Sequence, residues 1–178
     1  MTKKSLPLSR VYQLIEPGPV VMVTTSQEGR PNVMTMTWHM MIDFVPPILA
    51  CVISNQNYTF NIIKKTKECV INIPTVELAK KVVGVGNTTG SKVDKFEKFY
   101  LSEEPASKVN APLLTECYAN LECKVIDMTM SNKYNIFILE VVKAWTRPTK
   151  KRPRMIHHCG KGVFVVDGDV IKLPSKKK

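Results

Sequence analysis

The sequence has no uninterrupted apolar run of membrane-spanning length. A transmembrane helix needs about 20 mostly apolar residues, so no membrane partner is expected. The N-terminal segment MTKKSLPLSRVYQLIEPG also lacks the apolar core and small-residue cleavage site of a signal peptide. These two features predict a cytoplasmic protein.

Cysteine is present without a C-x-x-C pair, and its number is odd: Cys51, Cys69, Cys117, Cys123 and Cys159. Most of these lie inside apolar stretches, which predicts reduced, buried thiols rather than a disulfide or metal framework. His157 and Cys159 would share one face of a strand and could supply two ligands to a soft metal. No further ligands have fitting spacing, so no metal is predicted. The segment His157, His158 and Cys159 can equally line a cofactor mouth or a subunit interface.

Glycine is scarce, with 8 in 178 residues, and three of these lie in GVGNTTGSKVDKF (84–96). The dinucleotide fingerprint G-x-G-x-x-G follows a strand and opens a helix. Here the spacing is one residue longer, and Gly84 and Gly86 follow a predicted helix instead. We therefore expect these two glycines to end that helix, and we predict no pyrophosphate turn.

The charge balance is basic, with 26 lysines and arginines against 15 acidic residues and a net charge of +11. Such a field favours anionic partners. Part of the excess lies in residues 150–154 and in the terminal lysines 176–178, which are typical of solvated segments. A nucleic-acid-binding barrel is one interpretation, but no basic strand is interleaved with aromatic residues. We therefore predict no nucleic-acid partner.

Apolar periodicity predicts one domain over residues 1–178 with a basic tail at about 174–178. The predicted strands are 19–26, 31–43, 46–54, 68–74, 119–130 and 134–147, the predicted helices lie within 55–67, 76–83 and 93–100, and a small C-terminal hairpin is predicted within 162–174. In 31–43, alternation places Met34, Met36, Trp38 and Met40 on one face, opposite Thr35, Thr37 and His39. Strands connected mostly as hairpins indicate a mainly β, antiparallel barrel with short helices.

The order PGPVVMVTT, GRPNVMTMTWHM, PPILACVISNQNYTFNIIKKTKECVINIP, DKFEKF, APLLTECYANLECKV and IFILEVV resembles the flavin reductase-like family, within it the flavoredoxin branch. The likeness runs from about residue 17 to about residue 166. It implies a split β-barrel that binds FMN, with the flavin near the interface of a homodimer.

The resemblance also implies FMN-binding residues. Ser54, Asn57 and Thr59 surround a helix start that suits a phosphate, although many relatives have arginine where Asn57 stands; plain helix capping is the alternative. Asn32, Thr35 and Thr37 match the segment of the family that lines the ribityl chain and the isoalloxazine ring of FMN. Trp38 matches a tryptophan position of the family. It would form an apolar wall beside the cofactor or, alternatively, be buried in the core.

Three other positions complete the implied site. Lys95 in SKVDKF is the candidate cation, with Ser91 and Lys92 as lesser donors; alternatively Asp94 caps a short helix and both lysines are surface charges. Tyr134 stands where many relatives have a histidine, and Phe164 where they often have a tyrosine.

The function implied is an FMN-dependent oxidoreductase that passes electrons from NAD(P)H or a reduced protein donor to a flavin, iron or protein acceptor. No catalytic side chain is expected, because the flavin N5 accepts the electrons while the protein orients the ring. The alternative is a non-enzymatic FMN electron carrier, whose basic surface would dock an acidic redox protein.

Overall fold

The computed structural model describes residues 18–174. Its main sheet has seven antiparallel strands, in the order β2 (Arg30–Met36), β1 (Val21–Gln27), β5 (Glu68–Ile73), β8 (Ala119–Asp127), β9 (Ile136–Thr146), β4 (Pro47–Val52) and β3 (His39–Phe44). The predicted mainly β, antiparallel fold is confirmed. Of the predicted basic tail, residues 175–178 lie outside the described residues. Within the described residues, no helix is both long and apolar enough to cross a membrane.

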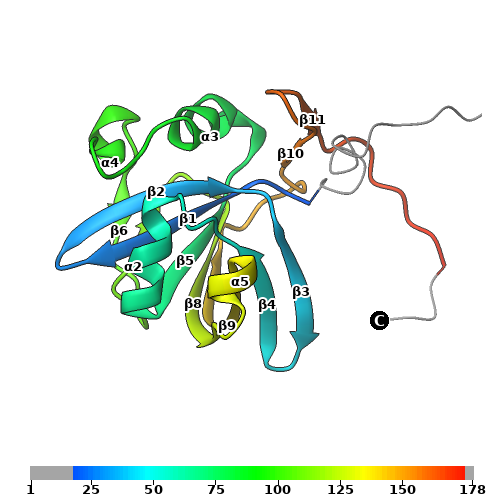
Figure 1. Cartoon of the computed structure of the whole chain (residues 1–178). Helices are drawn as coiled ribbons and strands as arrows, with labels where there is room; N and C mark the ends of the chain where they lie inside the picture. The colour runs from blue at the N-terminus through cyan, green and yellow to red at the C-terminus, as the bar shows by residue number, and fades with distance from the viewer. Residues whose placement is uncertain (1–17, 175–178) are drawn as a thin grey trace, which may run out of the picture.

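The main core lies inside the curved sheet, with α2 (Tyr58–Thr66) covering the opening between its two ends (Figure 1). Alternate side chains of β1, Val21 and Val23, point into this core, where they join Phe60 and Ile63 of α2. Cys51, Cys69 and Cys123 belong to the same core, and all five cysteines are free, four of them buried. The prediction of reduced, mostly buried thiols is therefore confirmed.

A second core forms on the outer face of β1 and β2, because Met22 of β1 and Val33 of β2 are apolar and point to that face. Val20, Met22 and Val33 pack against Val82 and Val85 of α3 (Ala79–Gly86). A 3-10 turn, η2 (Val76–Leu78), precedes α3, and α4 (Lys95–Lys98) follows it. The β1–β2 ribbon thus lies between α2 on one side and α3 with α4 on the other (Figure 1).

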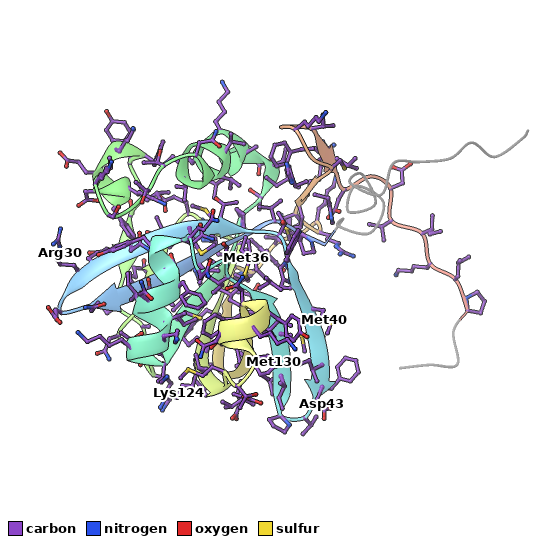
Figure 2. The ribbon with its side chains drawn as sticks, in the orientation of Figure 1. Arg30, Met36, Met40, Asp43, Lys124 and Met130 are labelled. Atoms are coloured by element: carbon purple, nitrogen blue, oxygen red, sulfur yellow. The ribbon has the colours of Figure 1, made fainter. Side chains whose placement is uncertain are left out.

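The predicted strand 31–43 is in fact two strands, because pairing stops at Thr37 and Trp38. β2 stays in the barrel with β1, whereas β3 forms a hairpin with β4 at the opposite edge of the sheet. The predicted methionine face therefore divides. Met36 is buried in the core, while Met40 lies along the outer hairpin with 64% of its surface exposed (Figure 2).

The predicted helices are present, with one correction to their ends. α2 begins after Asn57, and Asp94 caps α4 by accepting hydrogen bonds from the backbone N–H groups of Phe96 and Glu97. Gly84 does not end α3; the helix continues through it and ends at Gly86. A Cβ on Gly84 would lie 2.4 Å from Cε1 of Phe99, so this glycine permits close packing of helix and ring.

The segment from Tyr100 to Tyr118 is largely loop, with the short paired strands β6 (Glu103–Glu104) and β7 (Leu113–Leu114). β8 and β9 form the predicted antiparallel pair, and the connection contains the short helix α5 (Ser131–Tyr134).

The predicted C-terminal hairpin within 162–174 is wrong. β11 (Phe164–Val166) pairs with β10 (Ile156–His158), and residues 167–174 form no strand. The chain reverses at Gly160, Lys161 and Gly162, all of which have positive φ. The Asp167 carboxylate in the predicted Asp-Gly turn accepts a hydrogen bond from the Met155 N–H, which holds it beside β10 instead.

Candidate functional site

A polar chamber of about 180 Å³ lies between β2, the start of α2 and the loop that follows α3. We call it the narrow chamber. Its walls are Asn32, Met34, Thr35, Gln56, Asn57, Tyr58, Thr59, Val85, Gly86, Asn87, Thr88, Thr89, Gly90 and Lys95.

The first turn of α2 faces this chamber without a side-chain cap. Asn57 holds the N-cap position but makes no capping hydrogen bond, and the first turn contains no acidic residue. The first N–H groups of a helix have no partner within the helix and carry its positive dipole end. Capping, the alternative role of Asn57, is thus not what the structure shows, and this end of α2 suits an anion.

Asn32 and Gly90 shape the floor of the narrow chamber. The Asn32 amide donates a 2.9 Å hydrogen bond to the Thr59 hydroxyl. Its Oδ1 is buried and accepts no hydrogen bond from the residues that the structure describes. A Cβ on Gly90 would lie 1.9 Å from that oxygen, so only glycine lets the loop approach so closely. An unpaired buried acceptor is costly, and a ligand hydroxyl could satisfy it.

Lys95 is the only cationic side chain among the described residues that line the narrow chamber. It is buried, and its Nζ donates hydrogen bonds to the carbonyls of Val33, at 2.8 Å, and Val85, at 3.1 Å. It forms no ion pair with a described acidic residue. Burial lowers the pKa of Lys95 to about 8. The chamber therefore holds a cation whose charge only a bound anion can balance.

A wider chamber of about 770 Å³ continues from the narrow one and shares Thr35, Gly86 and Asn87 with it. We call it the wide chamber; its other walls are Val20, Thr37, Trp38, Val82, Val83, His158, Gly162 and Phe164. The Thr35 hydroxyl donates a 2.7 Å hydrogen bond to the Val82 carbonyl, which ties β2 to α3 where the chambers meet. The cleft thus offers an anion seat at one end and a largely apolar space for a flat ring at the other.

Trp38 forms one wall of the wide chamber. It lies at the break between β2 and β3, and 53% of its surface is exposed, so it is not a core tryptophan. Its carbonyl accepts a 3.0 Å hydrogen bond from the Val52 N–H, which holds the break in place. Of the two interpretations of this residue, the structure supports the apolar wall.

Eight of the twelve sequence-predicted binding residues line these two chambers: Asn32, Thr35, Thr37, Trp38, Asn57, Thr59, Lys95 and Phe164. Four do not line them. Ser54 shapes the turn before α2, its hydroxyl accepting from the Gln56 N–H at 3.3 Å. Ser91 is exposed and bonds Thr89, Lys92 is exposed, and Tyr134 lies on α5 with Lys133 over its ring.

Sequence reasoning missed the polar loop between α3 and α4. Asn87, Thr88, Thr89 and Gly90 all line the narrow chamber. In GVGNTTGSKVDKF, the first half therefore contributes more wall than SKVDKF, of which Lys95 alone lines the cleft. A run of small polar residues just after a helix was the available signal. His158 was noted in the sequence without being assigned to the site, because its strand was not predicted.

Comparisons with known proteins identify the family of this chain. A model of the "Flavin reductase like domain" matches residues 14–163. An uncharacterized protein of Archaeoglobus fulgidus is 37% identical over 113 residues, which is 64% of each chain. The match thus spans slightly less than two thirds of that relative.

Two solved structures share the fold. An FMN-binding domain of a flavin reductase-like enzyme from Shewanella baltica superposes with a TM-score of 0.82 at 26% identity, covering 95% of this chain and 96% of the other. Flavoredoxin of Desulfovibrio vulgaris gives 0.86 at 23% identity, covering 98% of both. The family match covers most of the sequence, and the fold agrees over nearly its whole length, so the chain belongs to the flavin reductase-like family.

Proposed function

We propose that the chain binds FMN, with the phosphate in the narrow chamber and the isoalloxazine ring in the wide chamber. The observation that carries this proposal is the polarity of the cleft. The narrow chamber has the uncapped start of α2 and the buried Lys95, which forms no ion pair with a described residue. The wide chamber has Trp38, Val83 and Phe164. FMN has the matching order of anion, polyhydroxyl chain and flat ring.

The residues present fit this cofactor. Asn57 stands where many relatives have an arginine, but Lys95 supplies a cation in the same chamber. The unpaired Asn32 Oδ1 lines the narrow chamber beside the start of α2, where it could accept a hydrogen bond from a hydroxyl of the ribityl chain. Thr35 and Asn87 line both chambers and add further polar groups along this path.

From this site we propose an oxidoreductase that takes electrons from NAD(P)H or a reduced protein and delivers them to a flavin, iron or protein acceptor. FMN, when bound, supplies the electron chemistry at N5. The chain's own residues hold the phosphate, position the ring and shield it from water. No side chain of the cleft is assigned a nucleophilic role.

Absorbance spectroscopy tests the binding step. The purified protein should carry a flavin spectrum, or acquire it with added FMN. Riboflavin, which lacks the phosphate, should bind far more weakly, because it leaves Lys95 and the start of α2 without an anion. A protein that binds neither compound contradicts the proposal. Equal affinity for FMN and riboflavin would contradict the assignment of the narrow chamber to phosphate.

A second candidate function is an FMN electron carrier. It is favoured by the fold likeness to a flavoredoxin, by the net charge of +11, and by Tyr134 lying away from the ring end of the cleft. Anaerobic rapid mixing separates the two functions. Fast bleaching of the flavin by NADH or NADPH indicates the enzyme. Bleaching only through an acidic protein donor, slower at high salt, indicates the carrier.

We also propose that the protein is a homodimer that uses the β3–β4 hairpin. The hairpin exposes Met40, Met41, Ile42, Phe44 and Val45, the last two with 81% and 88% of their surface accessible. Several large apolar side chains exposed on one hairpin are typical of an interface. The hairpin begins beside Trp38, so a partner covering it would lie at the mouth of the wide chamber.

A further inference from the structure

His158 is the only titratable side chain among the described residues that line the wide chamber. It lies in β10, directly opposite Phe164 of β11, and the two rings have centroids 5.1 Å apart at an angle of 49°. Both side chains face the space assigned above to the flavin ring. An imidazole in such a place is a candidate for proton exchange near neutral pH.

The hairpin that carries His158 is fixed on several sides. The Val20 N–H donates a 2.8 Å hydrogen bond to the Ile156 carbonyl, and the Cys159 N–H donates one of 2.8 Å to Val163. His157, the residue before His158, points to the other face of the strand, where its Nε2 lies 2.7 Å from the Asp167 carboxylate. Because neighbours in a strand alternate, anchoring His157 holds His158 toward the chamber.

The other described residues that line the wide chamber around His158 are uncharged. α3 contributes Val82, Val83, Gly86 and Asn87, and the β2–β3 region contributes Thr35, Thr37 and Trp38. Of the nearby ionisable groups on the hairpin, the Asp167 carboxylate bonds His157, the Cys159 thiol contacts the His157 carbonyl, and Lys161 is exposed in the turn. His39 of β3 has its ring nitrogen 2.8 Å from the Pro19 carbonyl. His158 is thus the group placed to answer a change of charge in the chamber.

Building on the proposed FMN site, we propose that His158 takes up a proton when the bound FMN is reduced. Bound FMN would supply the two-electron chemistry, and its reduction with one proton would add one negative charge to the chamber. His158 receives a second proton from solvent and becomes imidazolium. The chamber then has the same net charge before and after reduction.

The physical reason is the cost of an isolated charge in an apolar space. A negative ring beside neutral walls is poorly stabilised, whereas an opposite charge within a few ångströms favours both ionised forms. An ordinary imidazole titrates near pH 6.5, so a modest interaction is enough to shift its protonation at physiological pH. His158 therefore acts by balancing the charge of the reduced flavin. It does not have to contact the electron donor.

The test is the midpoint potential of bound FMN, measured from pH 6 to pH 8.5 with mediator dyes, in the unmodified protein and in His158→Gln. At pH 6, the ratio of the affinity for reduced FMN to the affinity for oxidised FMN should be about tenfold higher in the unmodified protein than in the variant. This corresponds to about 30 mV for a two-electron couple. The difference should shrink as pH rises, because proton uptake by an imidazole becomes less favourable at higher pH. Lys161→Gln, which removes an exposed titratable group from the same hairpin, is the matched control and should retain the pH dependence of the unmodified protein.

Nuclear magnetic resonance of ¹⁵N-labelled histidine provides a measurement on the unmodified chain, which has only three histidines. At pH 7 the His158 ring should be more protonated with reduced than with oxidised FMN. Unchanged His158 protonation, or identical potentials in a His158→Gln protein that retains FMN, would overturn this inference alone. Failure of the unmodified protein to bind FMN would instead overturn the proposed function.

Discussion

Lys95 sets the pH dependence of the narrow chamber, because its charge is buried beside two carbonyls and no carboxylate. Burial lowers its pKa to about 8, whereas lysine in an unfolded chain titrates near 10.4. Between these values the unfolded chain binds more protons than the folded one. Lys95 therefore costs the FMN-free protein stability below pH 8, and that cost disappears as pH rises toward about 10. A bound phosphate reverses the preference by favouring the charged amine.

Replacing this amine should weaken FMN binding selectively. At pH 7, Lys95→Met should lower FMN affinity about 10- to 100-fold, the value of one hydrogen bond to a charged group. The difference from the unmodified protein should shrink above pH 8, where Lys95 itself loses its charge. Fluorescence quenching of FMN measures both effects. Lys92→Met is the matched control, since Lys92 is exposed and outside the cleft; an equal loss in this control would contradict the role of Lys95.

Residues that face the cleft from regular elements could be predicted from the sequence, and those that reach it through loops could not. The resemblance to the family assigned Asn32 and Thr35 on a predicted strand, and the predicted start of a helix placed Thr59. Asn87 and Thr88 reach the chamber only because α3 packs across β2. This is a tertiary contact, which local sequence patterns do not reveal. Lys95 was identified as the cation, but its burial was not foreseen.

Among the elements, α3 depends on Gly84 for its contact with the ring of Phe99. Alanine is normally favoured over glycine in a helix by about 1 kcal/mol. At Gly84 the new methyl would lie 2.4 Å from Phe99, so Gly84→Ala should instead destabilise the fold by about 1–3 kcal/mol. Gly86→Ala, whose Cβ would meet Thr35 at 3.4 Å, should be near neutral. Urea denaturation of the FMN-free proteins gives both values; equal effects would contradict the packing argument.

The loop between β6 and β7 is anchored by the buried carboxylate of Glu122 on β8. It accepts hydrogen bonds from the Ser107 N–H and hydroxyl at 3.1 Å, the Lys108 N–H at 2.5 Å and the Trp145 Nε1–H at 2.7 Å. Burial acts to raise the pKa of Glu122, but these donors outweigh it and hold the pKa below the ordinary glutamate value. Its stabilising effect is therefore present above the ordinary pKa and is lost as pH falls through the lowered one.

Removing this carboxylate leaves four partly buried donor groups without their acceptor. Glu122→Ala should cost about 2–4 kcal/mol of unfolding free energy at pH 7, and Glu122→Gln less, with a weaker loss of stability in acid. Thermal or urea denaturation between pH 3 and 7 measures both. Glu104→Ala, at an exposed residue of β6 just before this loop, should change stability by less than about 0.5 kcal/mol. An acid profile of Glu122→Gln that matches the unmodified protein would contradict this assignment.

Element order was predictable because each strand has its own apolar pattern and each turn its own residues. The failures occur where tertiary contacts choose between local alternatives. The Asp-Gly pair at 167–168 predicts a tight hairpin. The Asp167 carboxylate instead contacts His157 and the Met155 N–H, and β11 pairs with the preceding strand β10. The alternation of 31–43 continues through Trp38, but the chain passes there from one edge of the sheet to the other.

At the scale of the whole molecule, the β3–β4 hairpin presents apolar side chains that the described residues leave uncovered. Burying such a surface is favourable by roughly 25 cal/mol per Å² of apolar area, so the protein should form a dimer through it. The double variant Met40→Glu and Phe44→Glu should be monomeric in sedimentation or light-scattering measurements, because it would bury four like charges in a symmetric interface. FMN affinity should fall as well, since Trp38 connects the hairpin to the wide chamber. Val170→Glu with Ile171→Glu places the same charges on another exposed apolar segment and should leave the dimer intact. A variant hairpin that still dimerises would assign the interface to a different face.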